Sequence, residues 1–227
     1  MNFFTSQIAK FLLKKPVFKY LIKEIYGLEN VPKGNFILAS NHQSHLDQIC
    51  NGAVLILSGH YNFHFLGQTD RYSGITKIFL YILYFLTGTI PVNRNDPLSR
   101  KKALEKVIEK LNQKKVVIIY PEGTRSRDGK IGKPKLGMAK IVLKTKVPVL
   151  PVAIKGSFES LKPGEVFPKL ERLIVIKVGK PLYFEKEIEM AKNLDESSND
   201  YQNLLENITQ KIMEEIKILY QQLETKV

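Results

Sequence analysis

The sequence has a single cysteine, Cys50, among its 227 residues. One thiol cannot form an internal disulfide bond, and it cannot supply the several thiolates of a cysteine-rich zinc site, so both structural supports are excluded. A lone cysteine also fits a reducing, cytosol-facing location, which is what we expect for this chain.

Long apolar runs are missing as well. A transmembrane helix needs about 20 consecutive apolar residues, whereas the longest run here, residues 78–86, has nine. We therefore expect no membrane-spanning helix. Lys10, Lys14 and Lys15 interrupt the apolar residues near the N-terminus, so we expect this segment to be retained and not cleaved as a signal peptide.

Positive charge is present in excess. The chain carries 35 lysine and arginine residues against 22 aspartate and glutamate residues, a formal net charge of +13. Residues 1–184 hold 30 of the basic and 12 of the acidic residues, close to +18, whereas residues 185–227 hold 5 and 10, close to −5. Such a basic body suits nucleic acid, an anionic membrane surface or a phosphorylated substrate.

Residues 1–25 are predicted to be membrane-associating helices. Residues 1–23 combine eleven large apolar side chains with five lysines and no acidic residue. Pro16 is expected to divide the segment into two short amphipathic helices, because proline is tolerated in a first helical turn but not inside a helix. The lysines would then face anionic headgroups. The alternative is a helix pair that packs on the core with a solvated lysine face.

The rest of the chain alternates between predicted strands and helices, which favours an α/β fold with a mostly parallel or mixed central sheet flanked by helices. Residues 26–184 would form this domain, and residues 185–227 a polar linker (194–200) followed by a C-terminal helix. The predicted strands are 36–40, 63–67, 89–93, 116–120, 149–154 and 173–178. The predicted helices are 46–57, 72–86, 98–112, 136–144 and 201–223.

Polar side chains follow directly on the strand predicted at residues 36–40, in the sequence SNHQSHLDQ (40–48). A histidine whose Nδ1–H is held by a carboxylate can act as a general base through Nε2. His42 and Asp47 would lie about 140° apart on one continuous helix. A catalytic dyad therefore requires His42 in the loop and Asp47 in the first turn of the next helix.

Two other interpretations of this stretch remain open. Ser44 and Asp47 have the spacing of a helix cap and its N3 partner, which needs no catalysis and is compatible with the dyad. A metal site of His42, His45 and Asp47 is the second alternative, but its spacing is not that of a zinc motif, and we expect no metal. We expect His45 to be exposed, or to support its neighbours without touching a substrate.

A nucleophile that could carry a covalent intermediate is not indicated. The sequence has no G-x-S-x-G elbow, and nothing marks Ser44 as activated. We therefore expect a substrate hydroxyl to attack directly, with His42 as its base.

Two further polar clusters fall at predicted strand ends. Residues 120–126 (YPEGTRS) contain Gly123, which permits close backbone approach, and Thr124 and Arg125, which offer donors suited to a phosphate. Residues 88–94 (GTIPVNR) end in Arg94. Either cluster alone is weak evidence for a binding site, because a glycine turn with an arginine is usually a solvated loop.

Taken in order, residues 41–47 (NHQSHLD), 88–94, 120–126 and 147–154 (VPVLPVAI) resemble the four blocks of the glycerolipid acyltransferases, most closely the 1-acylglycerol-3-phosphate acyltransferases. The resemblance covers roughly residues 25–182. The four blocks in this order are specific for the family, although no single block is. The family often has phenylalanine where Tyr120 stands.

The resemblance implies transfer of a fatty acyl group from acyl-CoA or acyl-carrier protein to the 2-hydroxyl of lysophosphatidic acid. His42 would be the general base and Asp47 its orienting partner. Arg94 of the second block and Arg125 of the third would bind the phosphate of the acceptor. Glu122 and Gly123 would form the acceptor-binding centre of the third block. No metal or redox cofactor is implied, because a thioester is already activated.

The resemblance also implies a peripheral or monotopic enzyme on the cytoplasmic face of an anionic membrane, with the N-terminal helices and residues 78–86 in contact with lipid. Other acceptors, namely glycerol-3-phosphate or another lysophospholipid, stay open, as does hydrolysis of a lipid ester or thioester. Nucleic-acid binding is not expected, because the aromatic side chains gather in apolar segments and do not alternate with basic ones.

Overall fold

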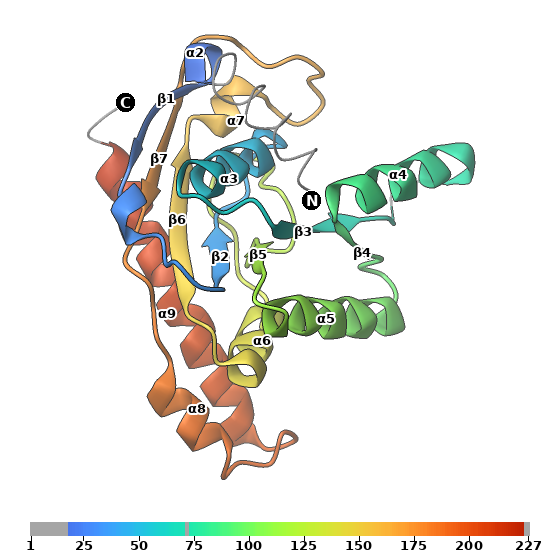
Figure 1. Ribbon diagram of the computed structural model, residues 1–227, viewed down its shortest axis with the longest axis vertical. Coiled ribbons are helices and arrows are strands. Elements are labelled where there is room, and N and C mark those ends of the chain that lie inside the picture. Colours follow the sequence, from blue (N-terminus) through green and yellow to red (C-terminus); the bar gives the residue numbers. More distant parts are fainter. Residues whose placement is uncertain (1–17, 71–72, 225–227) are drawn as a thin grey trace.

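The computed structural model describes residues 18–70 and 73–224, which form a central sheet with helices on both faces (Figure 1). The seven strands are β1 (Ile22–Tyr26), β2 (Ile37–Ser40), β3 (Phe63–Gln68), β4 (Ile90–Val92), β5 (Val116–Ile119), β6 (Val149–Lys155) and β7 (Ile174–Val178). Their order is β1-β7-β6-β2-β5-β3-β4. Among these strands only β6 and β7 pair antiparallel, and the predicted mixed α/β sheet is confirmed.

The helices connect these strands. They are α2 (Phe18–Tyr20), α3 (Leu46–Leu57), α4 (Gly74–Thr87), α5 (Pro97–Asn112), α6 (Gly137–Thr145), α7 (Ser157–Ser160), α8 (Glu185–Ala191) and α9 (Asn199–Glu224), with a 3-10 turn, η2, at Leu28–Asn30. Within the described parts of the chain, no helix combines the length and apolarity needed to cross a membrane.

The strands and helices predicted beyond residue 25 are all present, with ends within about two residues of the expected ones. The elements that were missed are β1, α7, α8 and the 3-10 turn η2. The prediction for residues 1–25 lies largely outside the described residues. Its last part is wrong, because Ile22–Tyr26 is a strand that pairs with β7 and buries Ile22 completely in the core.

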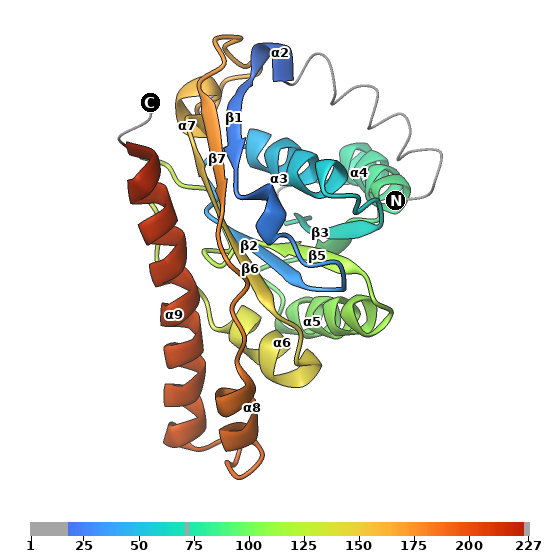
Figure 2. The ribbon, with the colours of Figure 1, turned by 60° about the vertical axis from the view of Figure 1, so that its left-hand side comes forward.

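The two faces of the sheet are covered by different helices. Ile37 and Ala39 of β2 belong to the core packed under α5, α6 and α9, whereas Leu38 belongs to the core under α3. This alternation follows from the two-residue period of a strand. Because both faces are buried, the central strands are continuous apolar runs. Figure 2 shows α3 and α9 on opposite sides of the sheet.

The C-terminal helix α9 is an integral part of this core. Its apolar residues recur every three or four positions and are buried against the sheet: Leu204, Leu205, Ile208, Ile212 and Ile216. Farther along, Leu219 and Leu223 pack with Ala153 of β6 and Val175 of β7. Residues 199–224 therefore stabilise the α/β domain and cover one of its faces.

The parallel strands bring their carboxyl ends to one edge of the sheet. β2 leads into His42, β5 into Pro121, β3 into Asp70 and β4 into Arg94. Asp96 accepts a hydrogen bond from the Leu98 N–H (2.9 Å) and caps α5, which ends the loop that carries Arg94. This edge is where ligands bind in open α/β sheets.

Ile208→Ala should lower the free energy of unfolding by about 2–5 kcal/mol, because the side chain is completely buried. Asn207→Ala, at the neighbouring exposed position of the same helix, is the matched control and should have little effect. Urea unfolding of both variants measures the difference. Equal stabilities would contradict the packing of α9 on the sheet.

Candidate active site

His42 and Asp47 are hydrogen-bonded to each other, as the predicted dyad requires. His42 lies in the loop after β2, and Asp47 is the second residue of α3, as the helix-geometry argument required. The Nδ1 atom of His42 lies 2.9 Å from Oδ2 of Asp47. The Asp47 side chain is fully buried and that of His42 is 14% exposed, so one edge of the imidazole is accessible. Since a carboxylate in its ionised form only accepts hydrogen bonds, this geometry suits the imidazole tautomer with its proton on Nδ1.

The same Asp47 oxygen also binds the backbone of the loop. Oδ2 accepts hydrogen bonds from the N–H groups of Gln43 (2.6 Å) and Ser44 (2.8 Å) as well as from His42. The bond to Ser44 is one half of the predicted cap. The other half differs, because the Ser44 hydroxyl accepts from Leu46 N–H (3.3 Å) and donates to the Leu161 carbonyl. One carboxylate thus orients the imidazole and fixes the backbone of the loop that leads into α3.

Tyr120 stacks on the imidazole. The ring centroids of Tyr120 and His42 lie 3.8 Å apart, with 12° between the planes. Burial, together with the nearby Asp47 carboxylate, raises the pKa of the Tyr120 hydroxyl well above its usual value, and the same two causes raise the pKa of the Cys50 thiol. Both shifts favour the protonated forms, which disfavours Cys50 as a nucleophile.

Glu122 joins the loop of His42 to the loop of Gly132. Its Oε1 accepts the backbone N–H of His42 (2.9 Å), and its Oε2 accepts the N–H of Gly132 (2.8 Å). The side chain is buried, and burial raises the pKa of its carboxyl although both hydrogen bonds oppose that shift. Ser126 N–H adds a bond to the His42 carbonyl (2.8 Å). The predicted contact between Glu122 and the acceptor stays a prediction.

Arg94 reaches the third block from the end of β4. Its Nη1 donates to the Gly123 carbonyl (3.3 Å), while Nη2 and Nε donate to the Asp70 carboxylate at 3.1 and 3.4 Å. Burial would raise the pKa of Asp70, but the hydrogen bonds from Arg94 outweigh it, and the pKa lies below its usual value. The carboxylate is therefore ionised and holds the guanidinium in place.

The turn after β5 carries the other predicted binding residues. Gly123 has φ +67°, a conformation that favours glycine. Thr124 is exposed, and Arg125 is partly buried next to Ser126, which bonds to His42. Contacts thus join the first block to the third through Glu122 and Ser126, and the second to the third through Arg94. His45 is exposed, and the described residues include no group of three His, Cys, Asp or Glu side chains placed to hold a metal.

The acyltransferase family model matches residues 23–155, more than half of the chain. The chain belongs to the acyltransferase family. A crystal structure titled as the 1-acyl-sn-glycerophosphate (LPA) acyltransferase of Thermotoga maritima is similar over 96% of this chain and 78% of that one, with a TM-score of 0.64 and 28% identity.

Curated members of the acyltransferase family are similar to parts of the chain. A chloroplastic 1-acyl-sn-glycerol-3-phosphate acyltransferase of Brassica napus is 31% identical over 79% of this chain and 50% of its own length. A 1-acyl-sn-glycerol-3-phosphate acyltransferase of Borreliella burgdorferi is 32% identical over 57% of this chain and 50% of its own. The chain spans about half the length of these relatives.

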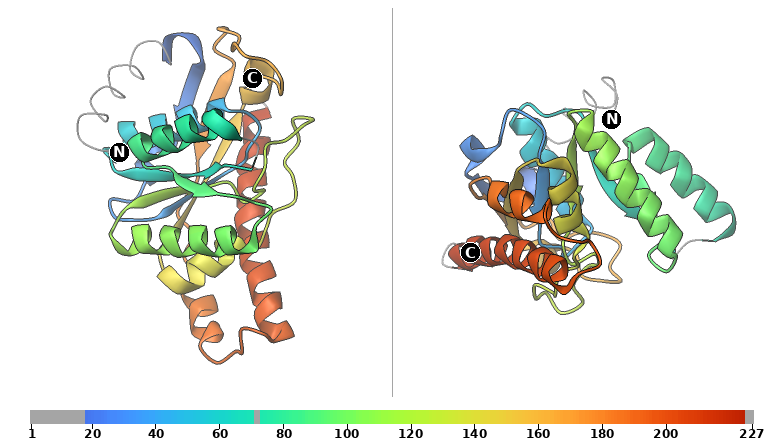
Figure 3. Two further views of the ribbon diagram at one scale, coloured as in Figure 1. Left: turned by 90° about the vertical axis from the view of Figure 1, so that its right-hand side faces the viewer. Right: turned by 90° about the horizontal axis from the view of Figure 1, so that it is seen from below.

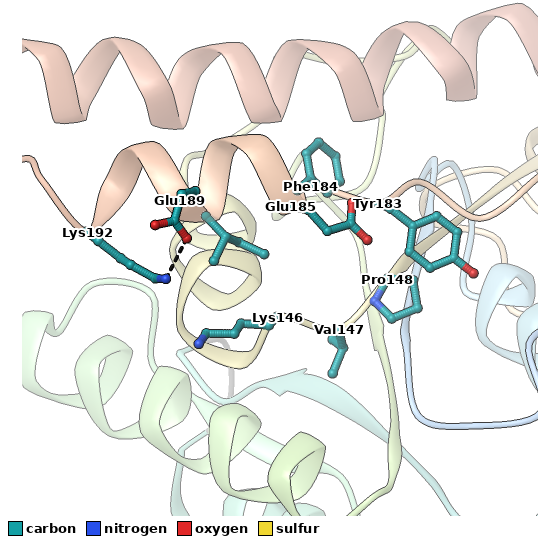
Figure 4. A pocket seen from close by; sticks show the side chains of 9 residues that line it. Lys146, Val147, Pro148, Tyr183, Phe184, Glu185, Glu189 and Lys192 are labelled. Atoms are coloured by element: carbon teal, nitrogen blue, oxygen red, sulfur yellow. Dashed lines mark hydrogen bonds and ion pairs between the residues drawn. The ribbon is translucent and has the colours of Figure 1, made fainter.

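A cavity of about 260 Å³ lies elsewhere on this acyltransferase domain, between the start of β6 and α8 (Figure 4). It is lined by Lys146, Val147 and Pro148, which precede β6, and by side chains such as Ile188 and Lys192. The amino end of β6 is the edge of the sheet opposite to His42, so this cavity is separate from the dyad.

One residue that builds the site, Asp70, was missed in the sequence. It follows a predicted strand, so the strand-end rule could have found it. Gln43 stands in the first block, but no local pattern indicated its contacts: its Nε2 donates to the Gly129 carbonyl and to the Tyr220 hydroxyl (3.2 Å). The loop after β2 is therefore bonded to α9, which lies outside the part of the chain that the acyltransferase family matches.

Glu122→Gln should lower the free energy of unfolding by about 1–3 kcal/mol. An amide oxygen can accept one of the two backbone N–H groups, but the amide nitrogen would face the other, which is left without an acceptor. Glu171→Gln, at an exposed position, is the matched control. Chemical denaturation checks this, and unchanged stability of the Glu122 variant would contradict the double acceptor role of its carboxylate.

Proposed function

We propose that this chain transfers a fatty acyl group from the thioester of acyl-CoA or acyl-carrier protein to the 2-hydroxyl of lysophosphatidic acid, which gives phosphatidic acid. The observation that carries the proposal is the His42–Asp47 hydrogen bond at the same edge of the sheet as Arg94 and the turn after β5. The Brassica and Borreliella relatives support lysophosphatidic acid as the acceptor, because both are named 1-acyl-sn-glycerol-3-phosphate acyltransferases.

In this mechanism Nε2 of His42 takes the proton of the acceptor hydroxyl as its oxygen attacks the thioester carbonyl carbon. Asp47 Oδ2 stabilises the imidazolium that forms, through the Nδ1–H bond. The tetrahedral intermediate collapses as the carbon–sulfur bond breaks, and His42 returns the proton to the leaving thiolate. The ester, the free thiol and the neutral imidazole are the products, so no protein nucleophile and no cofactor is consumed.

The acceptor phosphate would lie against the loops that follow β4 and β5. Arg94 is held there by Asp70 and Gly123, and Arg125 and Thr124 belong to the same turn as Gly123. A planar guanidinium suits a phosphate because it offers two parallel donors. Its fixed position lowers the entropy lost when the acceptor hydroxyl is brought to His42.

His42→Ala should reduce acyl transfer by about 10²–10⁴-fold, the usual contribution of a general base. Purified protein is offered labelled acyl-CoA and acyl-carrier protein with a panel of lysophosphatidic acid, glycerol-3-phosphate and other lysophospholipids. Phosphatidic acid should form fastest, from lysophosphatidic acid. His45→Ala is the matched control, since this exposed histidine three residues on makes no part of the dyad.

Either of two results would contradict this proposal. Full activity in the His42→Ala variant, with its unfolding transition intact, would remove the proposed base. Release of free fatty acid at the same rate with and without the acceptor would make the protein a hydrolase.

We also propose that the protein acts as a peripheral or monotopic enzyme on the cytoplasmic face of an anionic membrane, with α4 resting on lipid. Helix α4 contains one charged residue among 14, and Phe85 is 86% exposed. Exposed apolar side chains run along it: Ile75, Ile78, Phe79, Tyr81, Ile82, Leu83 and Phe85. A surface of this kind suits the acyl region of a bilayer.

The position of α4 supports this arrangement. It lies beside the edge strand β4, with α5 on the opposite face of that edge (Figure 3). Asp70 precedes α4 in the chain and Arg94 follows it after β4, so a membrane-bound α4 would bring the Arg94 loop to the level of the headgroups. The net charge of +13 favours anionic lipid.

The double variant Ile78→Ser, Phe85→Ser should weaken binding to vesicles of anionic phospholipid at least about tenfold, because each large apolar side chain that leaves lipid loses about 1.5–3 kcal/mol. Val166→Ser, Phe167→Ser removes two similarly exposed apolar side chains from the loop before β7 and is the matched control. Vesicle co-sedimentation measures both.

Equal vesicle binding by the two double variants would contradict the assignment of α4. If this helix instead held a second copy of the chain, the α4 variant would change the oligomeric state in sedimentation and leave vesicle binding intact.

A further inference from the structure

Lys135 lies against the turn that carries Gly123, although it is 12 residues farther along the chain. Its backbone N–H donates to the Pro121 carbonyl (2.8 Å), which fixes this point of the loop before α6 beside the turn after β5. The loop is also held by Gly132, whose N–H donates to Glu122. The backbone of Lys135 is therefore positioned by the third block itself.

The Lys135 side chain occupies the space that a side chain at residue 123 would need. A Cβ atom built on Gly123 would meet Cδ, Cε and Nζ of Lys135 at 3.1, 3.2 and 3.3 Å. The aliphatic stem and the ammonium thus lie along the glycine, whose carbonyl accepts the bond from Arg94. Glycine is required at position 123 for two reasons: its φ is positive, and a side chain there would meet Lys135.

Arg94 alone does not supply the net positive charge that a phosphate needs at this turn. The guanidinium of Arg94 is paired with the ionised carboxylate of Asp70, so the pair contributes almost no net charge. Lys135 is exposed, and within residues 18–70 and 73–224 no carboxylate lies within ion-pair distance of its ammonium. A phosphate monoester carries up to two negative charges and needs a cation without an acidic partner.

We propose that Lys135 binds the phosphate of the acceptor, as a specificity-determining residue of the same site. The inference rests on the proposed function and assigns a part of it to a residue outside the four sequence blocks. Arg94 would fix the geometry of the phosphate through its planar donors, and Lys135 would supply the uncompensated charge. An acceptor without a phosphate gains nothing from this ammonium.

The test compares wild type, Lys135→Ala, Lys135→Arg and the control Lys133→Ala, which removes an exposed lysine two residues away. Equilibrium binding of lysophosphatidic acid and of a monoacylglycerol with the same acyl chain is measured in detergent, and transfer to both acceptors is followed. Lys135→Ala should raise Kd and KM for lysophosphatidic acid roughly tenfold or more, with kcat nearly unchanged. Lys135→Arg should recover most of this loss, and no variant should change binding of the monoacylglycerol.

Equal effects of Lys135→Ala and Lys133→Ala would overturn the inference, because they would indicate general surface charge. Wild type that binds lysophosphatidic acid no more tightly than the monoacylglycerol would also overturn it. Failure of the proposed function is distinct: wild type would bind lysophosphatidic acid with the expected dependence on Lys135 but would not acylate it. The thermal unfolding transition of each variant checks that the fold is intact.

Discussion

The site depends on one buried oxygen, Oδ2 of Asp47, which accepts three hydrogen bonds from the loop that precedes its helix. A buried carboxylate is costly unless such donors stabilise its charge. Here the donors are the imidazole of His42 and the backbone N–H groups of Gln43 and Ser44, all in the loop before α3. The electrostatic stabilisation of the carboxylate and the orientation of the base are therefore the same interaction. The loop cannot reorganise without leaving that charge unsatisfied.

Around this centre, the site is built from mutual loop-to-loop contacts at one edge of the sheet. Glu122 joins the backbone of His42 to that of Gly132, and Arg94 joins Asp70 to Gly123. Each of these side chains bonds to the backbone of a neighbouring loop, so the loops hold one another in place. The imidazole of His42 and the guanidinium of Arg94 thereby lie at the same edge of the sheet.

Much of this arrangement follows from local sequence. Strands such as β6 are apolar on both faces and could be recognised from their continuous apolar runs. The rotation of about 100° per helical residue was enough to predict that a dyad needs Asp47 in the first turn of α3. The elements that were missed depend on distant partners. β1 contains two adjacent charged residues, Lys23 and Glu24, and becomes a strand only by pairing with β7, about 150 residues away. The bonds of Gln43 to Tyr220 and of Lys135 to Pro121 likewise join separate segments, and neither has a local pattern.

The tautomer of His42 tests the central claim most directly. In the neutral imidazole, nitrogen-15 NMR of the purified protein should find the proton on Nδ1, held by Asp47, and Nε2 without a proton and open to the acceptor hydroxyl. A neutral His42 that carries its proton on Nε2 would contradict the account, because the imidazole would then have no basic nitrogen facing the substrate.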